Sequence, residues 1–179
     1  MIGGSAGSLD VLLELFPLLK PTISVPIVLV LHRKSSNELM LTELIAAKTK
    51  LKVKEIEDKE EIRKSTVYIV PGDYHVLIEK SGQFSLDYSE KINFSRPSID
   101  VAFESASAAY GPELTCIVLS GANNDGSEGA KIAKENGGII IAQQPETAIV
   151  PFMPDFMIKH AQPQFVLNTK ELITYINLL

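Results

Sequence analysis

The stretch PIVLVL, residues 26–31, is a short, continuous apolar run that decides the fold class. A run without polar alternation is typical of a strand buried on both faces of a parallel sheet. A second such run, LTCIVL, occupies residues 114–119. Residues 9–16 carry large apolar side chains at the i, i+3, i+4, i+7 spacing of a helix that covers one sheet face. This alternation predicts an α/β fold, with a doubly wound, mostly parallel sheet flanked by helices on both faces.

The middle of the chain has a different pattern. Residues 66–70, 74–79 and 83–88 are short strand-like segments joined by turns that contain glycine, proline or aspartate. Short strands joined in this way favour an antiparallel meander, which we expect at one edge of the sheet. The sequence shows no convincing internal repeat or interdomain linker, so we predict a single domain over residues 1–179.

Composition excludes several classes of protein. Hydrophobic residues make up 45% of the chain, which is ample for a packed core. The 17 basic and 22 acidic residues give a formal charge of −5 without a lysine- or arginine-rich block, which disfavours a nucleic-acid partner. The single cysteine, Cys116, rules out an internal disulfide and a cysteine-based zinc site.

No apolar run reaches the roughly 20 residues that a membrane span needs, and no signal-peptide pattern precedes the first glycines. We therefore expect no membrane insertion and a reducing, cytoplasmic location. No histidine–carboxylate spacing indicates a metal site, and we expect no cofactor.

Three polar side chains follow the predicted strands at their carboxyl ends, where sites form in open parallel sheets. Ser5 stands just before the first helix, His32 directly follows residues 26–31, and Asp125 lies six residues beyond the second apolar run. Serine, histidine and aspartate are the nucleophile, the general base and the orienting carboxylate of an acyl-transfer triad. Triads are defined by geometry and role, so the chain order Ser, His, Asp is no obstacle.

The residues around Ser5 match the pattern G-x-S-x-G, as GGSAG at residues 3–7. In a strand–turn–helix this pattern raises the hydroxyl out of the sheet and leaves the next backbone N–H, here that of Ala6, free to bind an oxyanion. The positive end of the following helix favours the same negative charge.

Each of these residues also has a plainer interpretation. The glycine turn could hold a phosphate or nucleotide in a non-catalytic binding module, although G-x-G-x-x-G is not matched and no Gly-Lys-Ser/Thr follows. A histidine that ends a strand is commonly a structural or surface residue, and Asn-Asn-Asp-Gly around Asp125 is by itself a turn and helix cap. The convergence of all three residues favours the catalytic hypothesis. We expect His75, His160 and Cys116 to be packing residues.

Longer stretches resemble the catalytic domain of the chemotaxis protein-glutamate methylesterases of the CheB type. These stretches are IGGSAG (2–7), His32 after its apolar strand, VPGDYH (70–75), RPSID (96–100), VLSGANNDG (118–126) and AQQPETAIVPFMP (142–154). Together they cover nearly the whole chain in the order of the family. The match includes no receiver domain of the kind that often precedes this domain, so we expect the catalytic domain alone.

The resemblance implies a doubly wound α/β domain that hydrolyses γ-glutamyl methyl esters on the cytoplasmic helices of methyl-accepting chemotaxis receptors and releases methanol. Some members also deamidate receptor glutamines. By position, the nucleophile of the family falls on Ser5, its base on His32 and its orienting acid on Asp125. The resemblance adds the backbone N–H of Ala122 as a second oxyanion donor, at a position where the family usually has methionine.

Two cations, Arg33 and Lys34, directly follow the proposed base. The family usually has methionine and proline there, so the substrate groove of this chain is expected to differ. One interpretation is that the cations bind substrate by steering an acidic receptor helix towards the site. The other is that they are ordinary exposed side chains after a strand.

Overall fold

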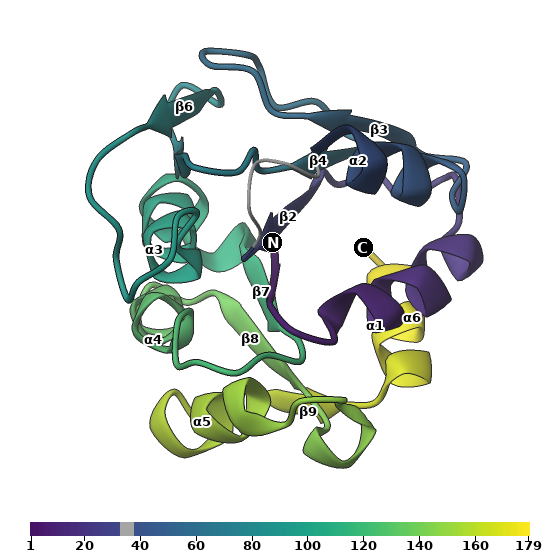
Figure 1. The fold of residues 1–179 in the computed structure, drawn as a ribbon, viewed down its shortest axis with the longest axis vertical. Coiled ribbons are helices and arrows are strands. Elements are labelled where there is room, and N and C mark those ends of the chain that lie inside the picture. Colours follow the sequence, from purple (N-terminus) through teal and green to yellow (C-terminus); the bar gives the residue numbers. More distant parts are fainter. Residues whose placement is uncertain (33–37) are drawn as a thin grey trace.

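Seven parallel strands form the central sheet of the protein, whose computed structural model describes residues 1–32 and 38–179 (Figure 1). The strand order is β3-β4-β2-β1-β7-β8-β9, and a separate two-stranded sheet pairs β5 with β6. The strands are β1 (Ile2–Gly4), β2 (Ile27–Leu31), β3 (Lys52–Glu55), β4 (Thr66–Ile69), β5 (His75–Ile78), β6 (Phe84–Asp87), β7 (Thr115–Val118), β8 (Ile139–Gln143) and β9 (Phe165–Leu167). The helices are α1 (Ser8–Leu15), α2 (Glu38–Ala46), α3 (Ile99–Tyr110), α4 (Ser127–Glu135), α5 (Phe152–His160) and α6 (Thr169–Ile176).

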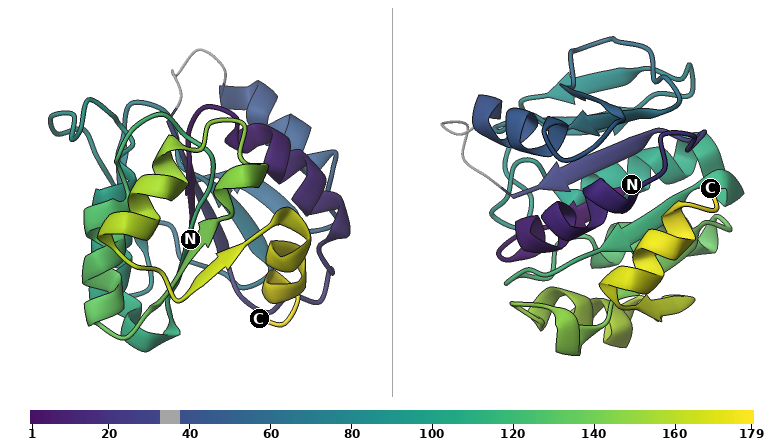
Figure 2. Two further views of the ribbon diagram at one scale, coloured as in Figure 1. Left: turned by 90° about the horizontal axis from the view of Figure 1, so that it is seen from below. Right: turned by 90° about the vertical axis from the view of Figure 1, so that its right-hand side faces the viewer.

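Two apolar cores lie on the two faces of the sheet. Helices α3, α4 and α5 cover one face, and α1, α2 and α6 cover the other, where α1 and α6 lie side by side (Figures 1 and 2). Successive side chains of a strand point to opposite faces, so Val28 and Val30 of β2 enter the first core while Leu29 and Leu31 enter the second. Burial on both faces explains the continuous apolar run of β2, and the layered arrangement confirms the predicted fold class.

The antiparallel part is smaller than the expected meander. Residues 66–70 supply β4, which is parallel to both of its neighbours, β3 and β2, inside the main sheet. Only β5 and β6 form an antiparallel hairpin, and its side chains Val76, Ile78 and Phe84 pack into the core beneath α3. The hairpin therefore packs against the α3 side of the domain rather than extending the sheet.

The strand register brings two of the candidate residues together. Gly4 of β1 pairs with Leu31 of β2, and the next residues along the two strands are Ser5 and His32. The His32 N–H donates to the Gly4 carbonyl at 3.2 Å. Parallel neighbours lie about 4.8 Å apart, so the backbones of Ser5 and His32 are adjacent at the carboxyl edge. The loop that carries Asp125 follows β7, which pairs with β1 on its other side.

Candidate active site

A tight turn holds Ser5 between β1 and α1. The Ser5 N–H donates to the Ser120 carbonyl (2.9 Å), and the Ser5 carbonyl accepts from the N–H (3.1 Å) and the hydroxyl (2.7 Å) of Ser8. Gly7 has a φ of 79°, which residues with a Cβ rarely adopt, and a Cβ there would lie 2.7 Å from the Ile149 Cβ. Gly7 occupies the N-cap of α1, and the Ser8 side chain closes the turn by donating to the Ser5 carbonyl.

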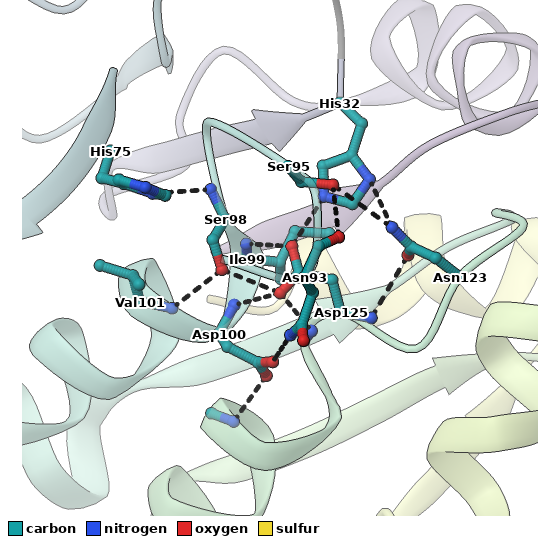
Figure 3. A network of polar contacts seen from close by, with 12 residues as sticks. His32, His75, Asn93, Ser95, Ser98, Ile99, Asp100, Val101, Asn123 and Asp125 are labelled. Atoms are coloured by element: carbon teal, nitrogen blue, oxygen red, sulfur yellow. Dashed lines mark hydrogen bonds and ion pairs between the residues drawn. The ribbon is translucent and has the colours of Figure 1, made fainter. Parts of the chain in front are cut away.

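His32 and Asp125 meet at the carboxyl edge although they lie 93 residues apart. The imidazole Nε2 lies 2.7 Å from the Asp125 Oδ2 (Figure 3), and the side chains are 11% and 0% exposed. A carboxylate can only accept a hydrogen bond, so Nε2 carries the hydrogen and Nδ1 carries the lone pair of the neutral ring. The nitrogen available as a base is therefore Nδ1.

The Asp125 carboxylate is bound on both oxygens. Besides the imidazole, it accepts from the Ser98 hydroxyl (2.9 Å) and from the backbone N–H groups of Ile99 (2.7 Å), Asp100 (3.1 Å) and Gly126 (3.1 Å). Burial opposes its negative charge, but the hydrogen bonds, that of His32 foremost, outweigh burial and hold the pKa of Asp125 below its ordinary value. Asp125 thus remains an ionised acceptor for the imidazole.

Ser98 links Asp125 to a buried histidine. Its hydroxyl caps α3 by accepting from the Val101 N–H (3.4 Å) and also donates to Asp125. Its N–H donates to Nδ1 of His75 (3.0 Å), whose Nε2 donates to the Glu90 carbonyl (3.0 Å). His75 is 1% exposed on β5, and sequence reasoning missed its contact with this network, which Figure 3 shows.

A second carboxyl group lies beside Asp125. Asp100 accepts from the Gly129 N–H at the start of α4 (2.8 Å) and from the Asn93 amide (3.0 Å). Burial, together with the neighbouring charge of Asp125, raises the pKa of Asp100 to about 7, against the favourable bond from Gly129. Of the two carboxyl groups, Asp125 therefore holds the negative charge more firmly.

Asn123 contacts the other ring nitrogen of His32. Its amide nitrogen lies 3.3 Å from Nδ1 and 3.4 Å from the Ser95 hydroxyl, and its carbonyl oxygen accepts from the Asp125 N–H at 3.3 Å. The sequence alone gave no sign of this contact, because Asn123 is part of a turn whose side-chain directions depend on neighbouring loops.

The orientation of the Ala6 N–H follows from the turn around Ser5. In a planar trans peptide the C=O and N–H point in opposite directions. Because Ser8 holds the Ser5 carbonyl, the Ala6 N–H is directed away from Ser8. It donates to no other residue of the described part of the chain.

The peptide before Ala122 is fixed in the same manner. The Gly121 carbonyl accepts from the Met153 N–H at the start of α5 (3.0 Å), so the Ala122 N–H points the opposite way. Ala122 is exposed, and its N–H has no acceptor among the described residues. The oxyanion roles of both N–H groups stay predictions, as does the role of Ser5, whose hydroxyl makes no hydrogen bond with another described residue.

Of the other residues considered in the sequence, some lie within the described part of the chain and some lie outside it. Arg33 and Lys34 lie outside the described residues, so their contact with substrate stays a prediction. His160 stacks on Phe156 with ring centroids 3.8 Å apart, which confirms its packing role. Burial raises the pKa of Cys116 to about 12, so this thiol is inert as a nucleophile.

The described residues include neither a candidate metal site nor a candidate membrane span. Across 1–32 and 38–179, no group of three or more histidine, cysteine or acidic side chains is arranged to hold a metal ion. Within the same ranges, none of the helices combines the length and apolar character needed to traverse a bilayer.

Hydrolytic α/β enzymes keep their acid–base groups at the carboxyl edge of the sheet and fix an imidazole with a carboxylate. The site described above falls into that class. The sequence matches the CheB methylesterase family over residues 1–176. The chain therefore belongs to the CheB methylesterase family, which confirms the resemblance seen in its motifs and the predicted enzyme class.

Individual relatives agree with this membership. The crystal structure of the Thermotoga maritima CheB methylesterase catalytic domain superposes with a TM-score of 0.95 at 34% identity, covering 99% of this chain and 96% of that one. A Leptospira interrogans protein, provisionally named protein-glutamate methylesterase/protein-glutamine glutaminase, is 40% identical over 96% of this chain and 89% of its own length. The Thermotoga maritima protein-glutamate methylesterase/protein-glutamine glutaminase is 36% identical over 93% of this chain but only 49% of its own length.

Proposed function

We propose that the protein is a serine esterase that hydrolyses glutamyl methyl esters on the cytoplasmic helices of chemotaxis receptors and deamidates receptor glutamines. The names of its relatives, which combine both activities, support this substrate class. The observation that carries the proposal is the 2.7 Å bond between His32 and the buried Asp125, next to the backbone of Ser5.

In the first half of the reaction, the Ser5 hydroxyl attacks the ester carbonyl carbon while Nδ1 of His32 takes its proton. Asp125 holds the Nε2–H and stabilises the imidazolium without being protonated itself. The carbonyl oxygen becomes an oxyanion that accepts from the N–H groups of Ala6 and Ala122. Nδ1 then returns the proton to the leaving methoxide, and methanol departs from an acyl-enzyme.

In the second half, water attacks the acyl-enzyme and Nδ1 takes a proton from that water. The tetrahedral intermediate collapses, the proton passes to the Ser5 oxygen, and a glutamate side chain is released. A glutamine substrate follows the same steps with ammonia as the first leaving group. The net reaction consumes one water and yields glutamate with either methanol or ammonia.

The decisive experiment measures methanol release from methylated receptor fragments together with labelling by a fluorophosphonate probe. We expect the probe to modify Ser5 covalently and Ser5→Ala to lower kcat by about 10⁴ to 10⁶. His32→Ala should abolish labelling, whereas Ser81→Ala, an exposed serine of the β5–β6 turn, should change neither signal. Ester hydrolysis near the wild-type rate in Ser5→Ala would end the assignment. Saturable nucleotide binding without labelling would instead favour a non-catalytic binding module.

Arg33 and Lys34 enter the proposal as the groups that steer an acidic receptor helix to the site. Reversing both charges should slow turnover of receptor fragments, most strongly at low salt, and spare a small glutamyl ester. Equal losses on both substrates would contradict steering while leaving the chemistry intact.

A further inference from the structure

Both ring nitrogens of His32 have partners of opposite kind. Asp125 accepts from Nε2, while the amide NH₂ of Asn123, which is only a donor, lies 3.3 Å from Nδ1 (Figure 3). The two contacts select the same tautomer, with hydrogen on Nε2 and a lone pair on Nδ1.

The direction of the Asn123 amide is set by the loop itself. Its carbonyl oxygen accepts from the Asp125 N–H, so its NH₂ must face the imidazole and the Ser95 hydroxyl. The reversed amide would bring its oxygen against the Nδ1 lone pair and its NH₂ against an N–H donor. The observed orientation is the one in which each contact of Asn123 joins a donor to an acceptor.

This contact falls on the atom that the proposed reaction uses. The Nδ1 lone pair accepts the Ser5 proton in that reaction, and it can accept only one strong hydrogen bond at a time. The three contacts of Asn123, at 3.3 to 3.4 Å, are at the long end for hydrogen bonds, so the amide is held loosely. Its NH₂ already lies within reach of Ser95 as a second acceptor.

We propose that Asn123 is a positioning residue that occupies the Nδ1 lone pair of His32 in the resting site, keeps that nitrogen free of a proton, and yields it to Ser5 when substrate binds. The inference rests on the proposed function for its catalytic meaning. Once Nδ1 carries a proton, its N–H and the Asn123 NH₂ are two donors facing each other, so the amide must turn towards Ser95.

Charged and uncharged groups lie on opposite sides of the imidazole. The Asp125 carboxylate meets Nε2, and Asp100 of α3 lies beside Asp125. Among the described residues, the hydrogen-bond partner of Nδ1 is the uncharged amide of Asn123. A donor at Nδ1 requires a lone pair on that nitrogen, so Asn123 and Asp125 hold the same tautomer from opposite sides of the ring.

The test is ¹⁵N NMR of histidine-labelled protein, which distinguishes a ring nitrogen that carries hydrogen from one that carries a lone pair, with the His32 signals identified by comparison with His32→Gln. In Asn123→Ala we expect the Nδ1 signal to move towards that of a free lone pair. In the nearly isosteric Asn123→Asp, a carboxylate that only accepts hydrogen bonds faces Nδ1, so we expect the ring hydrogen to move to Nδ1 and the Nδ1 signal to become that of a protonated nitrogen. The kcat for a small glutamyl ester should fall in Asn123→Asp, because Nδ1 then carries a hydrogen in place of its lone pair.

Asn124→Ala is the matched control, since Asn124 is the exposed neighbour in the same loop and should leave both readouts unchanged. If Asn123→Ala does not fold, the Asn123→Asp variant alone tests the proposal. An Nδ1 signal in Asn123→Asp equal to that of wild type would overturn the proposal. The NMR readout needs no turnover, so absence of fluorophosphonate labelling in the wild-type protein would refute the proposed function separately.

Discussion

Replacing Asp125 by asparagine alters the most heavily hydrogen-bonded side chain of the site. Its Oδ1 accepts three hydrogen bonds, and its Oδ2 accepts two, from the His32 imidazole and the Ile99 N–H. An asparagine amide has one accepting and one donating end. The three bonds survive best if the new carbonyl takes the Oδ1 position, which leaves an NH₂ facing His32 and Ile99.

The Asp125→Asn substitution should lower both the stability of the protein and its kcat. The Ile99 N–H loses its acceptor in a buried position, and the remaining bonds lose their charge, so we expect unfolding free energy to fall by about 2–4 kcal/mol. The new NH₂ also forces Nε2 of His32 to accept, which moves the ring hydrogen to Nδ1 and removes the base. A wrong tautomer of this kind costs about 10⁴ in kcat.

The assay combines urea unfolding with methanol release by the Asp125→Asn protein. In the wild type, the stability contributed by the ionised Asp125 is present above the unfolded carboxyl pKa of about 3.9 and is lost as the pH falls through its lower folded pKa. The variant should lack this acid-dependent loss. A kcat within tenfold of wild type would refute the role assigned to Asp125.

Two further predictions concern the groups around Asp125. His75→Leu removes the acceptor of the buried Ser98 N–H and should lower the unfolding free energy by about 1–3 kcal/mol in urea titrations, whereas an unchanged midpoint would exclude a structural role for His75. The folded pKa of Asp100, about 7, exceeds its unfolded value, so its contribution to stability is full below about pH 4 and is lost as the pH rises to about 7. Asp100→Asn should therefore gain stability over wild type at pH 8 but not at pH 4, and a pH-independent difference would contradict the raised pKa.

Much of the fold could be predicted because β2 and β7 are buried on both faces and carry uninterrupted apolar runs. The strand β3 could not be predicted, since its sequence KVKE holds three charged residues and one apolar residue at the edge of the sheet. Residues 66–70 contain a strand, as predicted, but this strand pairs in parallel with β2 and β3 and not with the antiparallel strands of the expected meander. The sequence of a four-residue strand does not indicate which strands it will pair with, because pairing depends on contacts with distant parts of the chain.

The site could be predicted only in part for a similar reason. The proximity of His32 and Asp125 could be predicted, because both follow parallel strands and the carboxyl ends of parallel strands lie at one edge of the sheet. The double role of Ser98, as cap and as donor to Asp125, and the contact of His75 with Ser98 depend on how β5 and α3 pack together. The contact of Asn123 with the imidazole likewise arises between two loops far apart in sequence.

The two interpretations of Asp125, as a helix cap and as the carboxylate that orients His32, are met by one geometry. The N–H groups of Ile99 and Asp100 belong to the first turn of α3, where a helix has no internal acceptors, and the Gly126 N–H precedes α4 in the same way. The Asp125 carboxylate accepts hydrogen bonds from the free N–H groups at the starts of both helices. The positive ends of these helices stabilise its negative charge in a position shielded from water. The ion that orients His32 is thus the same ion that joins α3 to α4. Changes at Asp125 must therefore alter stability and catalysis together, whereas Asn123, which contacts the opposite side of the imidazole, should allow the base to be altered without loosening the helices.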